Sequence, residues 1–464
     1  MITLEKGVSP VLVVLLSCAA QFMVVLDVSV VNVALPTIRD ALGFDAAGAQ
    51  WVVNGYGLTF AGFLLLGGRI ADICGLRAAV VGGLALFGAA SLVGGLADSP
   101  AVLVAARVAQ GLGAAALAPA TLTLLTTTFP EGPRRVRVIA WWTAVGLAGG
   151  TGGNMLGGAI TEFVSWRWIL LINVPLVAAA LAVAMTRLRV EQRRPATTRL
   201  DLPGATTAVV GLTALTHGVG AAHDRGWGDP ATLVALGAGL VSLVAFVVVE
   251  ARFARAPLFP LRLLALRAVS VGNVLVVLVA VCLVPMWFFL AFLMQDGLGF
   301  SPFQTGMGFL PHTLITMVVG VWAAPRLLRR LGLRITIVVA AIVAALGFGW
   351  QWLNAIHLDG GYVEELLGPA ILISVGGGLL NTPITAAVTS GVPHADSGAA
   401  SGLMNTAKQF GGAVGLAVLV GAASGPSGLA YGPAFTGMAI VLAAVGVGAC
   451  FLPRPAERGR ALTV

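Results

Sequence analysis

The feature that most constrains the fold of this chain is the recurrence of long apolar segments. A helix needs about 20 apolar residues to cross a bilayer. Only 10% of the 464 residues are charged, whereas soluble proteins carry about 25%. The sequence therefore predicts an all-α integral membrane protein with fourteen transmembrane helices, near residues 10–35, 47–67, 78–97, 100–127, 137–160, 167–186, 203–222, 231–249, 268–294, 304–325, 334–353, 366–390, 399–423 and 432–452.

The distribution of basic residues supports this count. If the N-terminus lies in the cytoplasm and the segments alternate, 22 of the 27 Lys and Arg residues fall on the cytoplasmic side. Basic residues favour that side, so we expect a multi-pass protein of the bacterial cytoplasmic membrane with both termini inside. The net charge of +8 then reflects topology, and we expect no nucleic-acid partner. The four cysteines are far apart and predict neither disulfides nor a metal site.

Asp27 is the most unusual residue of the first segment, in the stretch LDVSVVNVALPTI (26–38). An acid inside a membrane span is costly and marks a functional site by default. The alternative is a helix-end acid that reaches for water, but the Asp side chain is short. Arg107 in the fourth segment lies at nearly the same depth, about 10–14 Å from the outer helix ends. We therefore predict contact between the two, directly or through water, the alternative being that Arg107 binds backbone carbonyls.

Other polar residues recur inside the apolar segments. Each amide alone fits a contact between helices, but together they suggest a wet central cavity lined by Gln21, Asn32, Gln110, Asn273, Asn381, Asn405, Lys408 and Gln409. Trp141 and Trp287 are candidates for an apolar part of its wall, with an interfacial aromatic belt as the rival interpretation. His312 is either a proton relay or a solvated or packed side chain.

The fifth segment is rich in glycine, including Gly149, Gly153, Gly157 and Gly158. Small residues let membrane helices approach closely. We expect this face to provide both tight packing and a surface on which two halves rock, although packing alone would explain it. A weak internal repeat, Gly-Leu-Arg at 75–77 and again at 332–334, is typical of transporters built from repeats.

With these residues in view, the chain resembles the fourteen-spanner drug:proton antiporters of the major facilitator superfamily. LDVSVVNVALPTI is similar to their first-helix signature, and LVAARVAQGLGAA (103–115) to their helix-four motif, with Arg107 at its Arg. GGNMLGGAITEFVSWRWILLINVP (152–175) is similar to the helix-five motif, although Asn154 stands where Pro is usual. NTAKQFGG (405–412) is similar to the helix-thirteen segment, with Lys408 in place of Arg. GGRIADICGLR (67–77) matches the motif after helix two at Gly68, Asp72, Gly75 and Arg77.

The resemblance implies an architecture and an activity. Residues 1–186 and 268–464 would form two six-helix bundles, and 187–267 would supply linkers and two extra transmembrane helices. The chain would export cargo by alternating access, driven by inward proton flow through Asp27 and Arg107. Asn154 would join the cavity residues. Asp72 and Arg77 would latch a cytoplasmic gate through helix-end and ionic contacts.

The charges inside the membrane also narrow the cargo, because one acid faces two bases. We expect a neutral, zwitterionic or anionic amphiphile, such as an antibiotic-like metabolite, carried by a monomer with no cofactor other than protons. An enzyme would need clustered acid, base or nucleophilic residues, which the short loops lack. A channel would need rings of like residues. A proton-independent facilitator of a small metabolite is the main alternative.

Overall fold

A computed structural model describes residues 9–130, 132–188, 201–226, 228–253, 261–355, 360–390, 392, 397–425 and 428–453. These residues are helical apart from loops and one short hairpin, in which β1 (Ser424–Gly425) pairs with β2 (Gly428–Leu429). The α-helices are α1 Pro10–Leu42, α2 Ala46–Cys74, α3 Leu76–Gly95, α4 Pro100–Thr128, α5 Pro133–Phe163, α6 Trp168–Leu171, α7 Asn173–Arg187, α8 Leu202–Arg225, α9 Pro230–Val248, α10 Arg267–Leu283, α11 Pro285–Phe292, α12 Pro302–Gly308, α13 Leu310–Val318, α14 Ala324–Asn354, α15 Gly368–Thr389, α16 Ser397–Ala423 and α17 Tyr431–Ala449.

Local sequence explains where many helices begin and end. Proline occupies the first turn of α1, α4, α5, α8, α9 and α12, where its missing N–H costs nothing. Ser301 and Gln304 form a capping box at the start of α12, which satisfies two otherwise free backbone donors. Gly43 ends α1 at φ 70°, a left-handed conformation that favours glycine.

Two breaks interrupt long helical stretches: the one at Gly332 lies between two predicted segments, whereas the one at Pro285 lies inside the predicted segment 268–294. Gly332 inside α14 has φ 75° and ψ 175°, so Ala324–Asn354 contains a sharp bend. Pro285 begins α11 directly after α10, because proline cannot donate the next helical hydrogen bond. A π-helical turn, Val319–Ala323, joins α13 to α14.

In the part of the chain that the structure describes, eleven helical stretches are long and apolar enough to cross a membrane. One of them, Pro302–Asn354, has 53 residues and contains the bend at Gly332. Neither α2 nor α5, which the sequence also predicts to span the membrane, is among the eleven. Large apolar side chains cover the outside, as shown by Val234 and Val241 of α9, both 69% exposed. Such a surface suits lipid rather than water.

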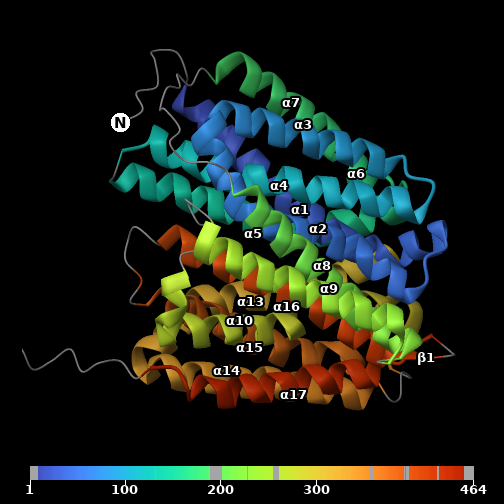
Figure 1. Ribbon diagram of the computed structural model, residues 1–464. Helices are drawn as coiled ribbons and strands as arrows, with labels where there is room; N and C mark the ends of the chain where they lie inside the picture. Colours follow the sequence, from blue (N-terminus) through green and yellow to red (C-terminus); the bar gives the residue numbers. More distant parts are fainter. Residues whose placement is uncertain are drawn as a thin grey trace, which may run out of the picture.

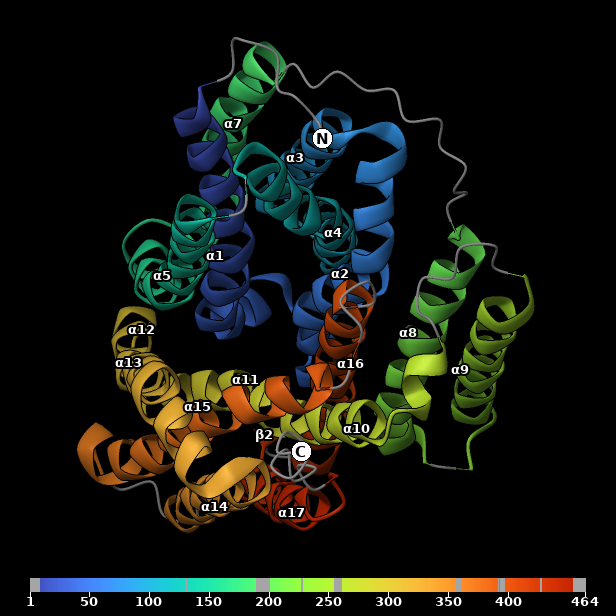
Figure 2. The same cartoon turned by 90° about the vertical axis from the view of Figure 1, so that its left-hand side faces the viewer.

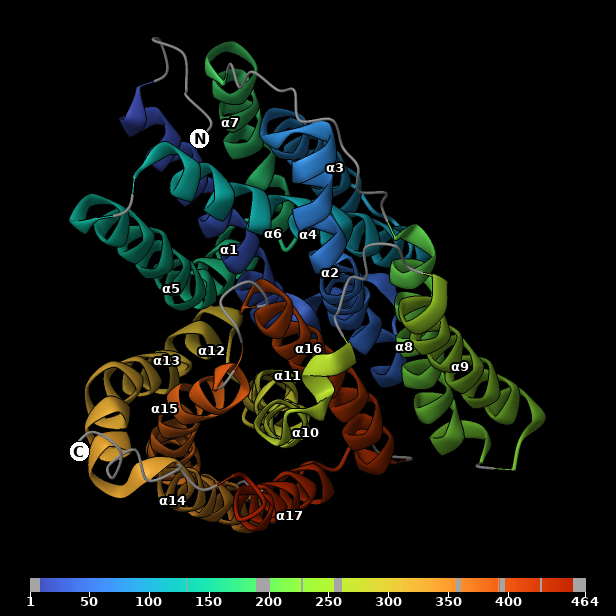
Figure 3. The same ribbon diagram turned by 60° about the vertical axis from the view of Figure 1, so that its left-hand side comes forward.

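The helices form two groups with a pair at the side. Helices α1–α7 lie together in the upper part of Figure 1 and α10–α17 in the lower part; we call these sets the N-terminal and C-terminal halves. Helices α8 and α9 pack on each other beside the two halves, at the right of Figure 2. Helix α8 contacts both α2 and α16, which themselves pack together across the halves (Figure 3).

An apolar cluster of buried residues joins the two halves. It includes Val30 and Ile38 of α1 together with Phe288 and Phe292 of α11. Helix α1 begins and helix α17 ends on the left in Figure 1; we call this side the terminal end of the bundle. Ile38 and Phe292 lie near the ends of their helices, so the cluster extends toward the opposite end.

Candidate functional site

The carboxylate of Asp27 lies at the centre of a buried polar network in the N-terminal half. Asp27 is fully buried, at 0% exposure. Arg107 of α4 pairs with its Oδ2 through Nη1. Gln110 Nε2 and Asn173 Nδ2 both donate to its Oδ1, at 3.0 and 3.1 Å. The predicted contact between Asp27 and Arg107 is confirmed, and two amides complete the shell that a buried carboxylate requires.

Arg107 makes further contacts that fix its guanidinium. Its Nε donates to the carbonyl oxygen of Val52 at 2.9 Å, and its Nη1 also donates to Gln110 Oε1 at 2.9 Å. The guanidinium lies over the ring of Tyr56, 4.5 Å from the ring centre. Binding to a backbone carbonyl was the predicted alternative to the ion pair with Asp27. Arg107 makes both contacts, because a guanidinium has five N–H donors.

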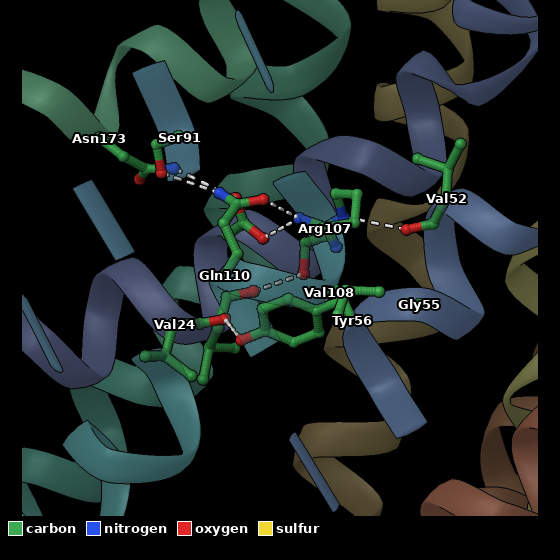
Figure 4. A network of polar contacts seen from close by, with 12 residues as sticks. Val24, Val52, Gly55, Tyr56, Ser91, Arg107, Val108, Gln110 and Asn173 are labelled. Carbon is green, nitrogen blue, oxygen red and sulfur yellow. Dashed lines mark hydrogen bonds and ion pairs between the residues drawn. The ribbon is translucent and has the colours of Figure 1, made fainter. Parts of the chain in front are cut away.

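Figure 4 shows the network, whose members come from α1, α2, α3, α4 and α7. Asp27 belongs to α1, Arg107 and Gln110 to α4, and Asn173 to the start of α7. Gln110 Nε2 also donates to Ser91 Oγ of α3 at 2.8 Å. Tyr56 of α2 donates its hydroxyl to the carbonyl oxygen of Val24 at 3.3 Å. Through these contacts the carboxylate is linked, directly or by way of Arg107 and Gln110, to α2, α3, α4 and α7.

Asn173, Ser91 and Tyr56 are members that the sequence did not single out. A lone serine or tyrosine in an apolar segment gives little signal, because either can bond its own backbone. Asn173 offered a better one: it is an amide within ILLINVP (169–175), and an amide inside an apolar segment needs a partner. Its fully buried side chain finds that partner in Asp27.

Between the two halves lies a cavity of about 1420 Å³. Its lining includes residues near the terminal end, such as Gly68 of α2, Thr123 of α4 and Ser401 of α16. Of the predicted cavity residues, the structure brings eight to this wall: Gln21, Asn32, Asn154, Trp287, Asn381, Asn405, Lys408 and Gln409. Most of the residues predicted to line a central cavity therefore line this one, and they come from both halves.

The charged residues of this wall are both basic. Arg107 and Lys408 line the cavity, and no Asp or Glu is among the lining residues that the structure describes. Asp27 itself is not on the wall, so its carboxylate lies behind Arg107 as seen from the cavity. Within the described residues, no group of three or more His, Cys, Asp and Glu is placed to hold a metal ion.

Three predicted cavity residues lie elsewhere. Trp141 is 53% exposed on the outer surface, and its neighbour Trp142 lines the cavity instead, because adjacent helical residues point about 100° apart. Asn273 is buried and donates to the carbonyl oxygen of Val269 within its own helix at 2.8 Å. Gln110 belongs to the Asp27 network rather than to the cavity wall.

His312 is packed. It is buried at 2% exposure, and its Nδ1 is 3.0 Å from the hydroxyl of Ser374. Its ring lies beside Trp287, with the ring centres 5.9 Å apart. Ser374 and Trp287 line the cavity and His312 lies behind them. Its side chain is therefore packed rather than solvated, and the relay role stays a prediction.

The glycines of α5 pack against α1 and α12. A Cβ on Gly153 would lie 2.7 Å from Ser29 Cβ, and one on Gly157 would lie 2.7 Å from Val30 Cα, while Gly149 likewise faces the backbone of α1. Gly158 faces α12 of the C-terminal half, where its Cβ would be 2.4 Å from the carbonyl oxygen of Pro302. The glycine face therefore serves close packing within one half and contact with the other.

The predicted gating motif lies at the terminal end. Gly68 lines the cavity, and Gly75 links α2 to α3 at φ 97°, where a side chain would be strained. Arg77 donates to the carbonyl oxygen of Met185 at 2.7 Å, in the last turn of α7, where a cation also complements the helix dipole. The side chain of Asp72 lies outside the described residues.

The halves touch at the end opposite the termini. Arg39 at the end of α1 forms an ion pair with Asp296 at 2.5 Å. Gln295 donates to the carbonyl oxygen of Val33 at 2.8 Å. The backbone N–H of Phe303 donates to Glu162 at 2.9 Å. These contacts close the opposite end, while the cavity extends toward the terminal end.

Membrane-length helices that surround a large cavity with polar side chains in its wall, and a charge pair buried beside it, are typical of a multi-pass membrane transporter. The chain belongs to the Major Facilitator Superfamily, whose pattern matches residues 17–416. The family assignment expected from the sequence motifs is thereby confirmed.

Several relatives have names that refer to antibiotics. The chain is 52% identical over 446 residues to the cephamycin export protein CmcT of Amycolatopsis lactamdurans, covering 94% of this chain and 91% of that protein. It is 41% identical to the puromycin resistance protein pur8 of Streptomyces alboniger, covering 86% and 79%. It is 33% identical to the tetracenomycin C resistance and export protein of Streptomyces glaucescens, covering 86% and 73%. The chain is thus similar to transporters of bacterial membranes.

Solved structures support the fold. An auto-inhibited POT family peptide transporter matches with a TM-score of 0.65 at 15% identity, covering 97% of this chain and 98% of that one. The POT family transporter PepTSo matches with a TM-score of 0.67 at 13% identity, covering 95% and 97%. At these identities the likeness concerns the arrangement of helices alone.

Proposed function

We propose that this protein exports amphiphilic, antibiotic-like small molecules from the bacterial cytoplasm in exchange for protons, by alternating access. The relatives named for antibiotic export and resistance support the cargo class. The observation that carries the proton coupling is the buried Asp27–Arg107 pair, with Arg107 on the cavity wall and Asp27 behind it. An intramembrane acid of this kind is the usual mark of a proton relay.

The proposed topology has fourteen spans. Dividing Pro302–Asn354 at Gly332 and counting α2 and α5 with the remaining candidates gives this number. Residues 1–186 and 268–464 then form two six-helix bundles, and 187–267 holds linkers and the two extra spans. The distribution of basic residues places both termini, and so the terminal end, in the cytoplasm. The protein acts as a monomer, and protons are its only cofactor.

In this scheme the structure represents an inward-facing state. The cavity extends toward the terminal end, and Arg39–Asp296 helps close the opposite one. Cytoplasmic cargo enters the cavity, the halves rock, and cargo leaves on the other side, where Asp27 takes a proton. The two bundles pivot about a site near the midplane, as in repeat-built transporters. Arg77 stabilises the cytoplasmic gate at the terminal end through its contact with α7, and Asp72 contributes a second contact to this gate.

The coupling step depends on Arg107. When Asp27 is ionised, its charge holds the guanidinium against the network. Protonation removes that charge and weakens the pair, since a buried ion pair is stable only with both charges present. Arg107 then turns its charge toward the cavity, where cargo and water lie. Proton and cargo are thereby linked through one side chain without sharing a binding atom.

The first test separates this antiporter from a proton-independent facilitator. In proteoliposomes with a pH difference of one unit, exchange of one proton can support a cargo gradient of about tenfold. We expect wild type to accumulate cephamycin and to alkalinise the cargo-containing lumen as protons leave. Asp27→Asn should lose both responses and retain only downhill cargo exchange, because an amide does not titrate.

Asp98→Asn is the matched control, since Asp98 is exposed at the α3–α4 junction and should behave as wild type. Proton-driven accumulation by Asp27→Asn at the wild-type level would refute the coupling role. Downhill transport by wild type with no pH response would instead favour the facilitator.

A further inference from the structure

Lys408 of α16 is a charged residue of the cavity that the coupling scheme does not use. The chain contains only two lysines, Lys6 and Lys408. Lys408 lies within a candidate membrane span, Ala400–Ala423. Its side chain is exposed, and the space to which it is exposed is the central cavity, whose wall it forms. A compact ammonium ion at this position has no membrane surface within easy reach.

Lys408 has no ionic partner among the residues that the structure describes. Asp40 and Asp296 pair with Arg39, and Asp27 pairs with Arg107. The described lining contains no Asp or Glu. Arg107, the other cation of the wall, is already neutralised by Asp27. The cavity thus carries one uncompensated positive charge, and a charge away from bulk water requires a counter-ion.

The wall that surrounds Lys408 suits an amphiphile. Asn405 and Gln409 lie beside it on α16, and Trp287 adds an aromatic surface from the same half. The N-terminal half contributes Gln21 and a second aromatic side chain, Trp142, to the wall of the same cavity.

We propose that Lys408 is the binding site for a carboxylate of the cargo. The preferred ligand is an amphiphilic monocarboxylate whose apolar body contacts the aromatic surfaces that Trp287 and Trp142 contribute from the two halves. A ligand so placed touches both halves and supplies the counter-ion that the cavity lacks. This inference rests on the proposed function only in taking the central cavity as the cargo site.

The test compares two probes of nearly equal shape, 1-naphthaleneacetate and its neutral amide, 1-naphthaleneacetamide. Binding is measured by scintillation proximity on the purified full chain at pH 7.5, with no gradient present. A charge-assisted hydrogen bond discriminates by about tenfold or more against a neutral partner. We expect wild type to bind the acetate about tenfold more tightly than the amide.

Variants assign the preference to the ammonium ion. Lys408→Gln should bind both probes with equal affinity, and Lys408→Arg should retain most of the preference for the acetate because it keeps the charge. Lys6→Gln is the matched control, which removes the other lysine and should leave the preference unchanged. Equal binding of the two probes by wild type, or an unchanged preference in Lys408→Gln, would overturn the proposal.

A second measurement needs no folded variant. Acetylation of wild-type protein by acetic anhydride, followed by peptide mass spectrometry, reports the accessibility of Lys408. Naphthaleneacetate should protect Lys408 from acetylation, while the amide should not, and absence of protection by the acetate would also overturn the proposal. Because no pH gradient is used, a failure here leaves proton-driven export standing, and a failure of proton coupling leaves this binding result standing.

Discussion

At the scale of single residues, the candidate site consists of one acid and the donors that hold it. The charged pair could be predicted from the sequence. Charged residues are rare inside apolar segments, and the depth of Asp27 and Arg107 in the membrane follows from the number of residues between each of them and the end of its helix. Their neutral partners were harder to find. Asn173 comes from a segment more than 140 residues away along the sequence, and only the folded chain shows that its amide meets Asp27. The wrong placement of Trp141 on the cavity wall has a similar cause. Adjacent residues of a helix point in different directions, so Trp141 faces outward while Trp142 faces the cavity.

The predicted effect of Asn173→Ala follows from its single contact with the carboxylate. Interhelical hydrogen bonds in membranes are worth about 0.6–2 kcal/mol, so we expect the free energy of unfolding to fall by about 1 kcal/mol. A double-mutant cycle with Asp27→Ala, measured by unfolding in mixed detergent micelles, isolates the interaction. The loss should shrink toward zero once Asp27 is absent. Two fully additive losses would mean that Asn173 stabilises the fold through something other than this contact.

At the scale of elements, apolar length located the helices well but gave their ends poorly. The fifth predicted segment, 137–160, corresponds to α5 at Pro133–Phe163, because helices continue past the apolar stretch until a cap or a loop ends them. The break at Gly332 was placed between two predicted segments, whereas the π-helical turns were not foreseen, because apolar composition carries no signal for them. The close packing of α5 was predictable, since glycine at helical spacing has few other uses in a membrane span.

Gly157 provides a test of that packing with a matched control in the same helix. A Cβ at Gly157 would lie 2.7 Å from Val30 Cα, whereas a Cβ at Gly152 would meet nothing within 4 Å. Overpacking typically costs about 1–3 kcal/mol, so Gly157→Val should lower the thermal unfolding midpoint in detergent, and Gly152→Val should leave it nearly unchanged. Equal behaviour of the two variants would show that α1 and α5 do not approach as closely as described.

At the scale of the whole molecule, the two ends of the bundle differ. The terminal end is reached by the cavity, while the opposite end is closed by contacts that join α1 and α5 to the C-terminal half. The sequence could not predict this asymmetry. A protein that alternates between two conformations has one sequence, and that sequence must be compatible with both. Arg39 is central to the closed end: it bonds Asp296 across the halves, Asp40 on its own helix, and lies 4.9 Å from the ring centre of Phe292.

The Arg39–Asp296 pair should therefore bias the equilibrium between the two states. Both side chains are partly exposed, at 21% and 35%, and ion pairs of this kind contribute up to about 1 kcal/mol. Replacing Arg39 by Asp removes the pair and sets two acids against each other, which should shift the population toward the state open at the opposite end by about fivefold. Since Ser401 lines the cavity near the terminal end, a cysteine at position 401 in a cysteine-free background reports on that state.

In Arg39→Asp, the rate at which a maleimide labels position 401 from the terminal side should fall. Adding Asp296→Arg restores opposite charges in reversed order and should restore the wild-type rate. Asp40→Asn is the control within α1, because it changes a contact of Arg39 that does not cross the halves, so its rate should match wild type. A charge-swapped double variant that labels as slowly as Arg39→Asp would show that the closed end depends on the apolar cluster of α1 and α11 rather than on this pair. The ion pair would then be a consequence of closure and not one of its causes.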